Sequence, residues 1–379
     1  MENYALFPSP CYVIEETKLE RNLKLLSYVN QAAGVEIILA LKGFANWNTF
    51  PLVMKYLSGA TASSLAEARL CHDEMGVKAH TYAVGYKKDE MSEYLALSSH
   101  LTFNSLSQYE SINSKSKENA DVSFGIRINP RFSDVATDLY NPSAPASRLG
   151  VQAEELKDGL PEGIDGLHFH VLCESNSYTL EKTLEIVERD FPKALEQAKW
   201  LNMGGGHLIT GDNYDVDHLV SLLKAFQLKH NLELILEPGS AVAWQTGVLV
   251  SEVIDIVENG GVKTAILDVS FTCHMPDCLE MPYRPEIFGA EKEKPNGATH
   301  AYRLGGLSCL AGDYLEEYFF EHELNVGDRV IFDDMIHYTT VKTNMFNGIA
   351  HPSIGKLTKD GRAEVIREFN YNDYKNRLS

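Results

Sequence analysis

Short apolar runs alternate with amphipathic stretches through the first part of the chain. The apolar runs predict eight strands, over residues 35–42, 59–64, 80–85, 101–105, 122–129, 164–171, 200–206 and 232–239. Apolar residues at three- and four-residue spacing predict helices over residues 17–33, 64–75, 88–97, 178–198 and 216–230. Strands that alternate with helices in this way are typical of a (β/α)8 barrel. We therefore expect an α/β fold with a barrel domain over residues 15–240.

The pattern changes after Gly239, where helical periodicity is scarce. Strand-like runs lie at residues 247–257, 263–271, 300–305, 329–333, 338–346 and 364–369, and turns rich in Gly, Pro and Asp join them. These runs predict an antiparallel β-domain over residues 241–379. Residues 11–14 are also strand-like, so residues 1–14 are expected to join this second domain.

Composition and charge narrow the classes of function. A chain of 379 residues with 44% hydrophobic and 23% charged residues is expected to form two soluble globular domains. The net charge of −19 argues against a nucleic-acid partner, whose phosphates need a basic surface. Such a charge either serves solubility alone or attracts a cationic small-molecule substrate.

Nothing in the sequence indicates export or a membrane partner. No apolar run is long enough to cross a bilayer, and residues 1–5 lack the basic start of a signal peptide. The six cysteines have no regular spacing, so they are expected to be reduced thiols. We therefore expect a cytoplasmic protein.

Lys42 is the most informative single candidate, because it ends the first apolar run and precedes Gly43. Desolvation at the end of a buried strand disfavours the ammonium form and makes the amine a better nucleophile. Such a lysine can form a Schiff base with an aldehyde, including pyridoxal phosphate (PLP). Most lysines that end strands are simply solvated, so Lys42 gains weight only from its predicted neighbours.

Other polar or glycine residues end the later strands, and in a barrel those ends meet at one catalytic rim. Gly204, Gly205 and Gly206 either admit an anion to bare backbone amides or form a tight turn. Glu237 either hydrogen-bonds a pyridine nitrogen or is a solvated loop carboxylate.

His168 and His170 lie two residues apart and so share one face of a predicted strand. A metal site would need further ligands at neighbouring strand ends, and no such set is evident, so no metal is predicted. We expect His170 to stack on a planar cofactor and His168 to be a hydrogen-bonded core residue.

Together these motifs resemble the group IV PLP-dependent decarboxylases, which have the alanine racemase-like fold (PLP fold type III). The resemblance covers residues 10–348 and is carried by ALKGF, TASSLAEA, GIRINP, HFHVLCE, GGG, EPG, GLSCLAGD and HYTTVKTNMFNG. It implies a set of cofactor-binding residues: Lys42, Arg127, His170, Gly204, Gly205, Gly206, Glu237 and Tyr338. In that set Lys42 carries PLP, Glu237 contacts the ring nitrogen, and Tyr338 and the glycines bind phosphate.

The resemblance also implies a homodimer whose active sites lie at the interface, with Cys309 contributed by the second subunit. Cys309 or Lys42 then protonates the carbon that loses CO2. Two positions depart from the pattern: Ser240 replaces an arginine that helps to bind phosphate in many relatives, and Leu310 replaces an acidic residue after the cysteine.

Within the family, HVLCE, CHMPDCLEMPYRP and CLAGD are most similar to carboxynorspermidine/carboxyspermidine decarboxylases. This implies decarboxylation of carboxynorspermidine and/or carboxyspermidine to norspermidine or spermidine, in polyamine biosynthesis. The distal amines of such a substrate need acidic partners, for which Glu174, Asp277 and Asp313 are candidates, although each could be an ordinary surface carboxylate.

Three alternatives stay open. A diaminopimelate or an ornithine/arginine decarboxylase would share the fold, but the former needs a cationic group for a second carboxylate. An amino-acid racemase would use a tyrosine and a lysine and would not need Cys309. A non-enzymatic PLP carrier is a single barrel, against which the second domain argues.

Overall fold

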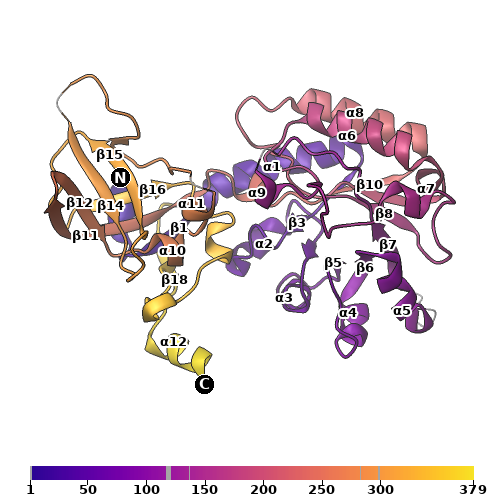
Figure 1. Cartoon of the computed structure of the whole chain (residues 1–379), viewed down its shortest axis with the longest axis horizontal. Helices are drawn as coiled ribbons and strands as arrows, with labels where there is room; N and C mark the ends of the chain where they lie inside the picture. The colour runs from indigo at the N-terminus through magenta and orange to yellow at the C-terminus, as the bar shows by residue number, and fades with distance from the viewer. Residues whose placement is uncertain (1, 117–120, 136, 282, 298) are drawn as a thin grey trace. The chain divides into compact units, whose positions relative to one another are not determined.

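The computed structural model describes residues 2–116, 121–135, 137–281, 283–297 and 299–379. Its contacts divide the chain into two compact units (Figure 1). The barrel unit is Arg21–Val242, and the sheet unit combines Met1–Glu20 with Ala243–Ser379. The sequence predicts boundaries after residues 14 and 240, whereas the two units meet after residues 20 and 242.

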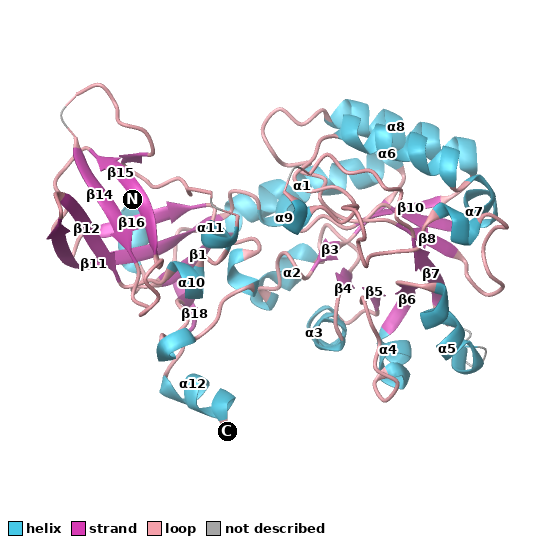
Figure 2. Cartoon of the chain, in the orientation of Figure 1, coloured by secondary structure: helices cyan, strands magenta, loops and turns pink. Residues whose placement is uncertain are grey.

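The barrel unit contains a parallel sheet that closes on itself (Figure 2). Its strands, in order, are β2 (Glu36–Ile37), β10 (Glu233–Leu236), β9 (Trp200–Asn202), β8 (Gly166–His168), β7 (Ser123–Arg127), β6 (Ser98–Phe103), β5 (Ala79–Tyr82), β4 (Ala60–Ala62) and β3 (Leu39–Ala40). Only Ile38 separates β2 from β3, so the two are one interrupted strand with a neighbour on each side. The predicted (β/α)8 barrel is therefore confirmed.

Helices follow most of the barrel strands. Helix α1 (Glu16–Ala33) precedes the first barrel strand, and the others are α2 (Phe50–Val53), α3 (Leu65–Met75), α4 (Met91–Leu97), α5 (Leu106–Ser116), α6 (Ser177–Asp190), α7 (Pro192–Gln197), α8 (Val216–His230) and α9 (Ser240–Ala243). Helix α8 has the predicted bounds, and Asp215 caps it by accepting from the His218 amide. The predicted helix 178–198 is divided at Pro192, which cannot continue a helix because it lacks an N–H.

The sheet unit is a nine-stranded mixed sheet. Its strands are β1 (Cys11–Glu15), β11 (Gly247–Asn259), β12 (Val262–Leu267), β13 (Ala290–Glu291), β14 (His300–Gly305), β15 (Tyr314–Phe320), β16 (Arg329–Asp333), β17 (Ser353–Leu357) and β18 (Ala363–Arg367). Strand β1 of the N-terminal segment pairs with β11 and β17. The pairs β1–β17 and β12–β14 are parallel, whereas the sequence predicts an antiparallel domain.

One predicted strand is wrong. Residues 338–346 form short helical turns, η5 (Thr339–Val341) and η6 (Phe346–Gly348), and Tyr338 has a φ of +53° that no regular strand accommodates. Strands β15 and β17 and helix α12 (Tyr371–Leu378) are additional elements that the sequence pattern does not predict.

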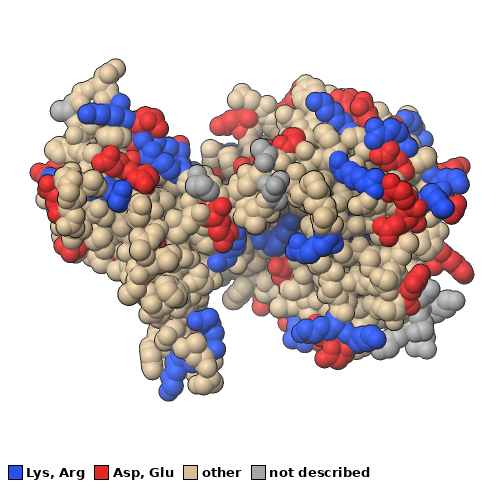
Figure 3. Space-filling model, in the orientation of Figure 1, with Lys and Arg blue, Asp and Glu red and all other residues tan. Residues whose placement is uncertain are grey.

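All six cysteines are free, and four of them are buried. On the face seen in Figure 3, basic and acidic side chains are interspersed over the barrel unit. Over the described part of the chain, no helix has both the length and the apolar character that a bilayer span requires.

The Trp200 side chain packs inside the barrel, where it lies against Gly166. Its indole Nε1 donates to Ser123 Oγ at 2.9 Å, and its ring clusters with Ile38 and Ile235. A Cβ atom on Gly166 would lie 2.0 Å from the indole, so this position has room only for hydrogen.

We therefore expect Gly166→Ala to lower the free energy of unfolding by about 1–3 kcal/mol, because overpacking displaces Trp200. Gly85→Ala is the matched control, since a Cβ atom there meets nothing within 4 Å. Urea unfolding measures both variants. Equal stability of Gly166→Ala and the wild-type protein would contradict this account of the packing.

Candidate active site

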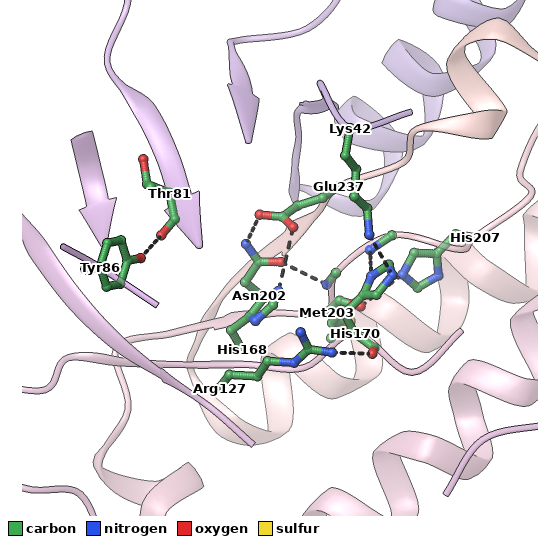
Figure 4. Close-up of polar contacts among 12 residues, drawn as sticks. Lys42, Thr81, Tyr86, Arg127, His168, His170, Asn202, Met203, His207 and Glu237 are labelled. Atoms are coloured by element: carbon green, nitrogen blue, oxygen red, sulfur yellow. Dashed lines mark hydrogen bonds and ion pairs between the residues drawn. The ribbon is translucent and has the colours of Figure 1, made fainter. Parts of the chain in front are cut away.

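Lys42 lies in the turn after β3, two residues beyond the end of the strand. The turn is closed by the Gly43 amide, which donates to Ala40 O at 3.0 Å. The Lys42 side chain is half-buried, and its Nζ lies 3.0 Å from Nε2 of His170 (Figure 4). The structure therefore brings together the two residues that the sequence placed at one rim.

The tautomer of His170 follows from its second hydrogen bond. The Gly205 amide donates to His170 Nδ1 at 2.8 Å, so Nδ1 carries no proton. Burial, followed by the charges of Lys42 and Arg127, holds the pKa of His170 well below its usual value, so the ring is neutral. Its single proton is therefore on Nε2 and donates to Lys42 Nζ, which must accept through the lone pair of an uncharged amine.

The pKa of Lys42 agrees with this assignment. Burial lowers the pKa of Lys42 to about 8, and the Arg127 guanidinium contributes to the decrease. Glu237 opposes the shift but does not cancel it. In an appreciable fraction of molecules, Lys42 is therefore an uncharged, nucleophilic amine near neutral pH.

Arg127 ends β7 and braces the segment that carries His170. Its side chain is 4% exposed, and Nη2 donates to the backbone oxygen of His170 at 3.0 Å. The guanidinium lies 4.8 Å from the ring centroid of Tyr82, a cation–π distance. Among the described residues, Nε of Arg127 has no acceptor.

Glu237 follows β10 and is buried between two polar side chains (Figure 4). Asn202 Nδ2 donates to Glu237 Oε1 at 2.6 Å, and His168 Nε2 lies 3.7 Å from Oε2. Burial raises the pKa of Glu237, but the interactions with His168 and Asn202 outweigh it and lower the pKa to about 2. The carboxylate is therefore ionised, and His168 is a core residue with an acidic partner.

Asn202 is a site residue that the sequence reasoning missed. It ends β9 and pairs in register with His168 of β8, which in turn pairs with Arg127 of β7. The last residues of three adjacent strands thus form one polar row. A search for polar residues at the end of each apolar run would have found this signal.

The glycine segment 204–206 makes hydrogen bonds and close backbone contacts within the protein itself. The Gly204 amide donates to Asn202 Oδ1 at 2.9 Å, so two of the three amides, with that of Gly205, are used within the protein. A Cβ atom on Gly206 would lie 2.0 Å from Leu172 O, and φ at Gly206 is +85°. Glycine is therefore required by close backbone approach as well as by any ligand.

A hollow of about 10 Å³ lies beside Gly206. Its lining residues are Glu174, Gly206, His207, Leu208, Gly239, Ser240 and Ala241. This space has room for about one water molecule. Glu174, a candidate for amine binding, is exposed and borders this hollow with a φ of +49°.

The remaining candidates, Cys309, Asp277, Asp313 and Tyr338, belong to the sheet unit. Cys309 is exposed. Asp277 forms an ion pair with Lys342. Asp313 is 4% exposed and accepts hydrogen bonds from protein donors, a geometry that does not support the prediction that it binds a substrate amine directly.

Comparisons with known proteins agree with the geometry of the rim. A family model described as "Pyridoxal-dependent decarboxylase, C-terminal sheet domain" matches residues 11–336. A carboxyaminopropylagmatine decarboxylase from Synechocystis sp. is 52% identical, over 98% of this chain and 95% of the relative. A carboxynorspermidine/carboxyspermidine decarboxylase from Campylobacter jejuni is 43% identical over 98% of each chain.

Solved structures support the same fold. Carboxynorspermidine decarboxylase from Campylobacter jejuni, complexed with norspermidine, is 42% identical with a TM-score of 0.90 and covers 98% of this chain and 100% of its own. Diaminopimelate decarboxylase from Helicobacter pylori, complexed with L-lysine, has a TM-score of 0.84 at 18% identity, over 99% and 98% of the two chains. At that identity the second match shows the fold alone.

The low pKa of Lys42 predicts its reactivity. In cofactor-free protein, an aldehyde trapped with borohydride should label Lys42 with a midpoint near pH 8, because the amine fraction rises as the pH passes that pKa. Lys199 is the internal control, since its hydrogen bond to Asp165 raises its pKa. Peptide mapping measures both positions.

Arg127→Met should move the Lys42 midpoint upward, because it removes a neighbouring positive charge. Arg131→Met is the matched control, since exposed Arg131 pairs with Glu154 instead. A Lys42 midpoint that coincides with that of Lys199 would contradict the neutral-amine assignment.

Proposed function

The chain belongs to the pyridoxal-dependent decarboxylase family, and from that premise we propose that it decarboxylates carboxynorspermidine and/or carboxyspermidine, giving norspermidine or spermidine. The chemistry rests on one observation: the Lys42 amine, 3.0 Å from His170, and the buried Glu237 carboxylate occupy the same barrel rim. The substrate class is supported by full-length relatives at 43% and 34% identity that carry this name.

Pyridoxal phosphate is the cofactor of this family, and the donor set of the rim fits its groups. Lys42 offers an amine to the aldehyde, Glu237 a carboxylate to the ring nitrogen, and His170 a flat ring. We assign the phosphate to the glycine segment 204–206 and to Tyr338. When bound, the cofactor supplies a ring that accepts the electron pair released as CO2 leaves.

The residues of the chain prepare and complete this step. Glu237, kept ionised by Asn202 and His168, would hold the ring nitrogen of the bound cofactor in its protonated form. The bond between the α-carbon and the carboxylate breaks, and a proton replaces the lost CO2 on that carbon. We assign the proton donor as the Cys309 thiol, with the Lys42 ammonium as the alternative.

A second candidate substrate is carboxyaminopropylagmatine, favoured by the relative that is 52% identical over nearly the whole chain. The named substrates share an amino-acid end on a polyamine and differ in the tail, which is an ammonium in one class and a guanidinium in the other. A guanidinium is bound best by a carboxylate that accepts two parallel hydrogen bonds. Exposed Glu174 and the ion-paired Asp277 are our candidates for contacts to either tail.

A CO2-release panel tests both candidates. We expect carboxynorspermidine and carboxyspermidine to exceed ornithine and diaminopimelate in kcat/KM by about ten- to a hundred-fold for each ion pair that the shorter substrates lack. A higher kcat/KM for carboxyaminopropylagmatine would favour the second candidate over the first. If ornithine or diaminopimelate is the better substrate, both assignments are wrong, although the cofactor chemistry stands.

We further propose a cytoplasmic homodimer with shared active sites. The six free cysteines suit a reducing compartment, and two-fold dimers are the commonest oligomers. In such a dimer Cys309 of one subunit serves the Lys42 site of the other.

Mixing Lys42→Ala protein with Cys309→Ala protein tests this arrangement. Random subunit exchange should restore about a quarter of wild-type activity, because each hybrid dimer has one intact site. Native mass spectrometry verifies the exchange. Verified hybrids without recovered activity would contradict shared sites.

A further inference from the structure

Cys309 lies in a tight connection between β14 and β15, residues 306–313, which we term the thiol loop. Its two ends are joined, because the Gly306 amide donates to Asp313 O at 2.7 Å. The Leu307 amide donates to Val269 O at 2.9 Å and attaches the loop to the segment after β12. The loop is therefore closed at its base.

Asp313 connects the thiol loop to that same segment through its side chain. Oδ2 accepts from Ser270 Oγ at 2.8 Å and from the Ser308 amide at 2.9 Å, and Oδ1 accepts from the Thr272 amide at 3.1 Å. A carboxylate buried to this extent is costly unless such donors satisfy it. The acid therefore joins residues 270–272 to the residue that immediately precedes the thiol.

The Asp313 carboxylate occupies the space beside Gly306. A Cβ atom on Gly306 would lie 2.5 Å from Asp313 Oδ2, so glycine at this position admits the acid. In the described parts of the chain, no lysine, arginine or histidine lies within ion-pair distance of Asp313. Its partners are all neutral donors of the same unit.

The backbone of Cys309 has an anchor of its own. The Cys309 amide donates to Asn347 Oδ1 at 2.8 Å. Asn347 belongs to η6 and has a φ of +58°, a conformation that asparagine tolerates better than most residues. Two successive amides, those of Ser308 and Cys309, are thus bound by side chains from different segments.

We propose that Asp313 and Asn347 are positioning residues that fix the direction of the Cys309 thiol. This inference rests on the proposed role of Cys309 as proton donor. A proton donor must come within hydrogen-bond reach of the atom it serves, and two fixed amides restrict the peptide that sets the Cα–Cβ direction of Cys309. Asp313 therefore acts through the thiol loop and leaves the recognition of substrate amines to other groups.

Asp313→Asn is the first test because it keeps the shape of the side chain. Whichever way the new amide is turned, its NH2 group faces a backbone N–H, either of Thr272 or of Ser308. Asn347→Ala removes the other anchor at an exposed position, and Asn347→Asp retains the accepting oxygen. Asp328→Asn is the matched control, since Asp328 accepts from the Asn325 amide in another turn of the sheet unit.

We expect kcat of the holoenzyme to fall about ten- to a hundred-fold in Asp313→Asn and Asn347→Ala, the cost of misplacing a reacting group by about 1 Å. KM should stay within about twofold, because no substrate contact is lost. Asn347→Asp should retain kcat within about twofold, as should Asp328→Asn.

Hydrogen exchange gives a readout that does not depend on turnover. Exchange of a peptide covering residues 306–313 should be faster in Asp313→Asn and Asn347→Ala, because the Ser308 and Cys309 amides lose their acceptors. Wild-type exchange in both variants would overturn the proposal, and so would faster exchange with an unchanged kcat. A wild-type kcat in Cys309→Ala would instead show that the proposed proton donor is wrong.

Discussion

The hydrogen bond from the Gly205 amide to His170 Nδ1 sets the protonation pattern of the barrel rim. A backbone amide can only donate, so the proton of the neutral imidazole must lie on Nε2. Lys42 Nζ is 3.0 Å from that atom and must therefore accept. The Gly205 amide thus influences the hydrogen-bonding role of Lys42, although it contacts only the imidazole of His170.

Burial alone does not explain why the pKa values of Lys42 and Glu237 both lie below their usual values. Desolvation favours the neutral form of both Lys42 and Glu237, and it is the largest influence on each pKa. The partners make the difference. Glu237 accepts a hydrogen bond from Asn202 and lies 3.7 Å from His168 Nε2, whereas Lys42 faces the like charge of Arg127. The same low-dielectric site therefore has two lowered pKa values with different causes: burial lowers that of Lys42, and hydrogen-bonding and charged partners lower that of Glu237.

The elements that sequence reasoning recovered are those in which local pattern and final environment agree. The barrel strands are buried on both faces and read as continuous apolar runs, so their number and order were predictable. Their carboxyl ends were predicted too long, because the residues after Arg127, Asn202 and Leu236 leave the ladder to form the rim. Asn202 was missed because its partners come from two other strands, and only their register brings them together.

The elements of the sheet unit that were not predicted correctly from sequence have a similar cause. Residues 338–346 have the composition of a strand, but the positive φ of Tyr338 turns the chain, and no residue type in the segment announces that conformation. Strand β15 was hidden because Glu316 and Glu317 interrupt its apolar alternation. A register shift opposite them, between Tyr302 and Leu304, lets two successive glutamates lie exposed. A bulge is set by the pairing of two strands and is invisible in either one alone.

The three candidate acidic residues differ in ways that the net charge of the chain does not reveal. From sequence, Glu174, Asp277 and Asp313 were equivalent candidates for one task, and the structure separates them by their partners. Asp313 is buried among neutral donors, and in this it resembles Glu237 of the other unit. A carboxylate can only accept, so each of these two gathers N–H or O–H groups from separate segments and keeps those segments at a fixed distance. The protein uses one property of an ionised acid twice, once to hold a charge at the rim and once to hold a loop in place.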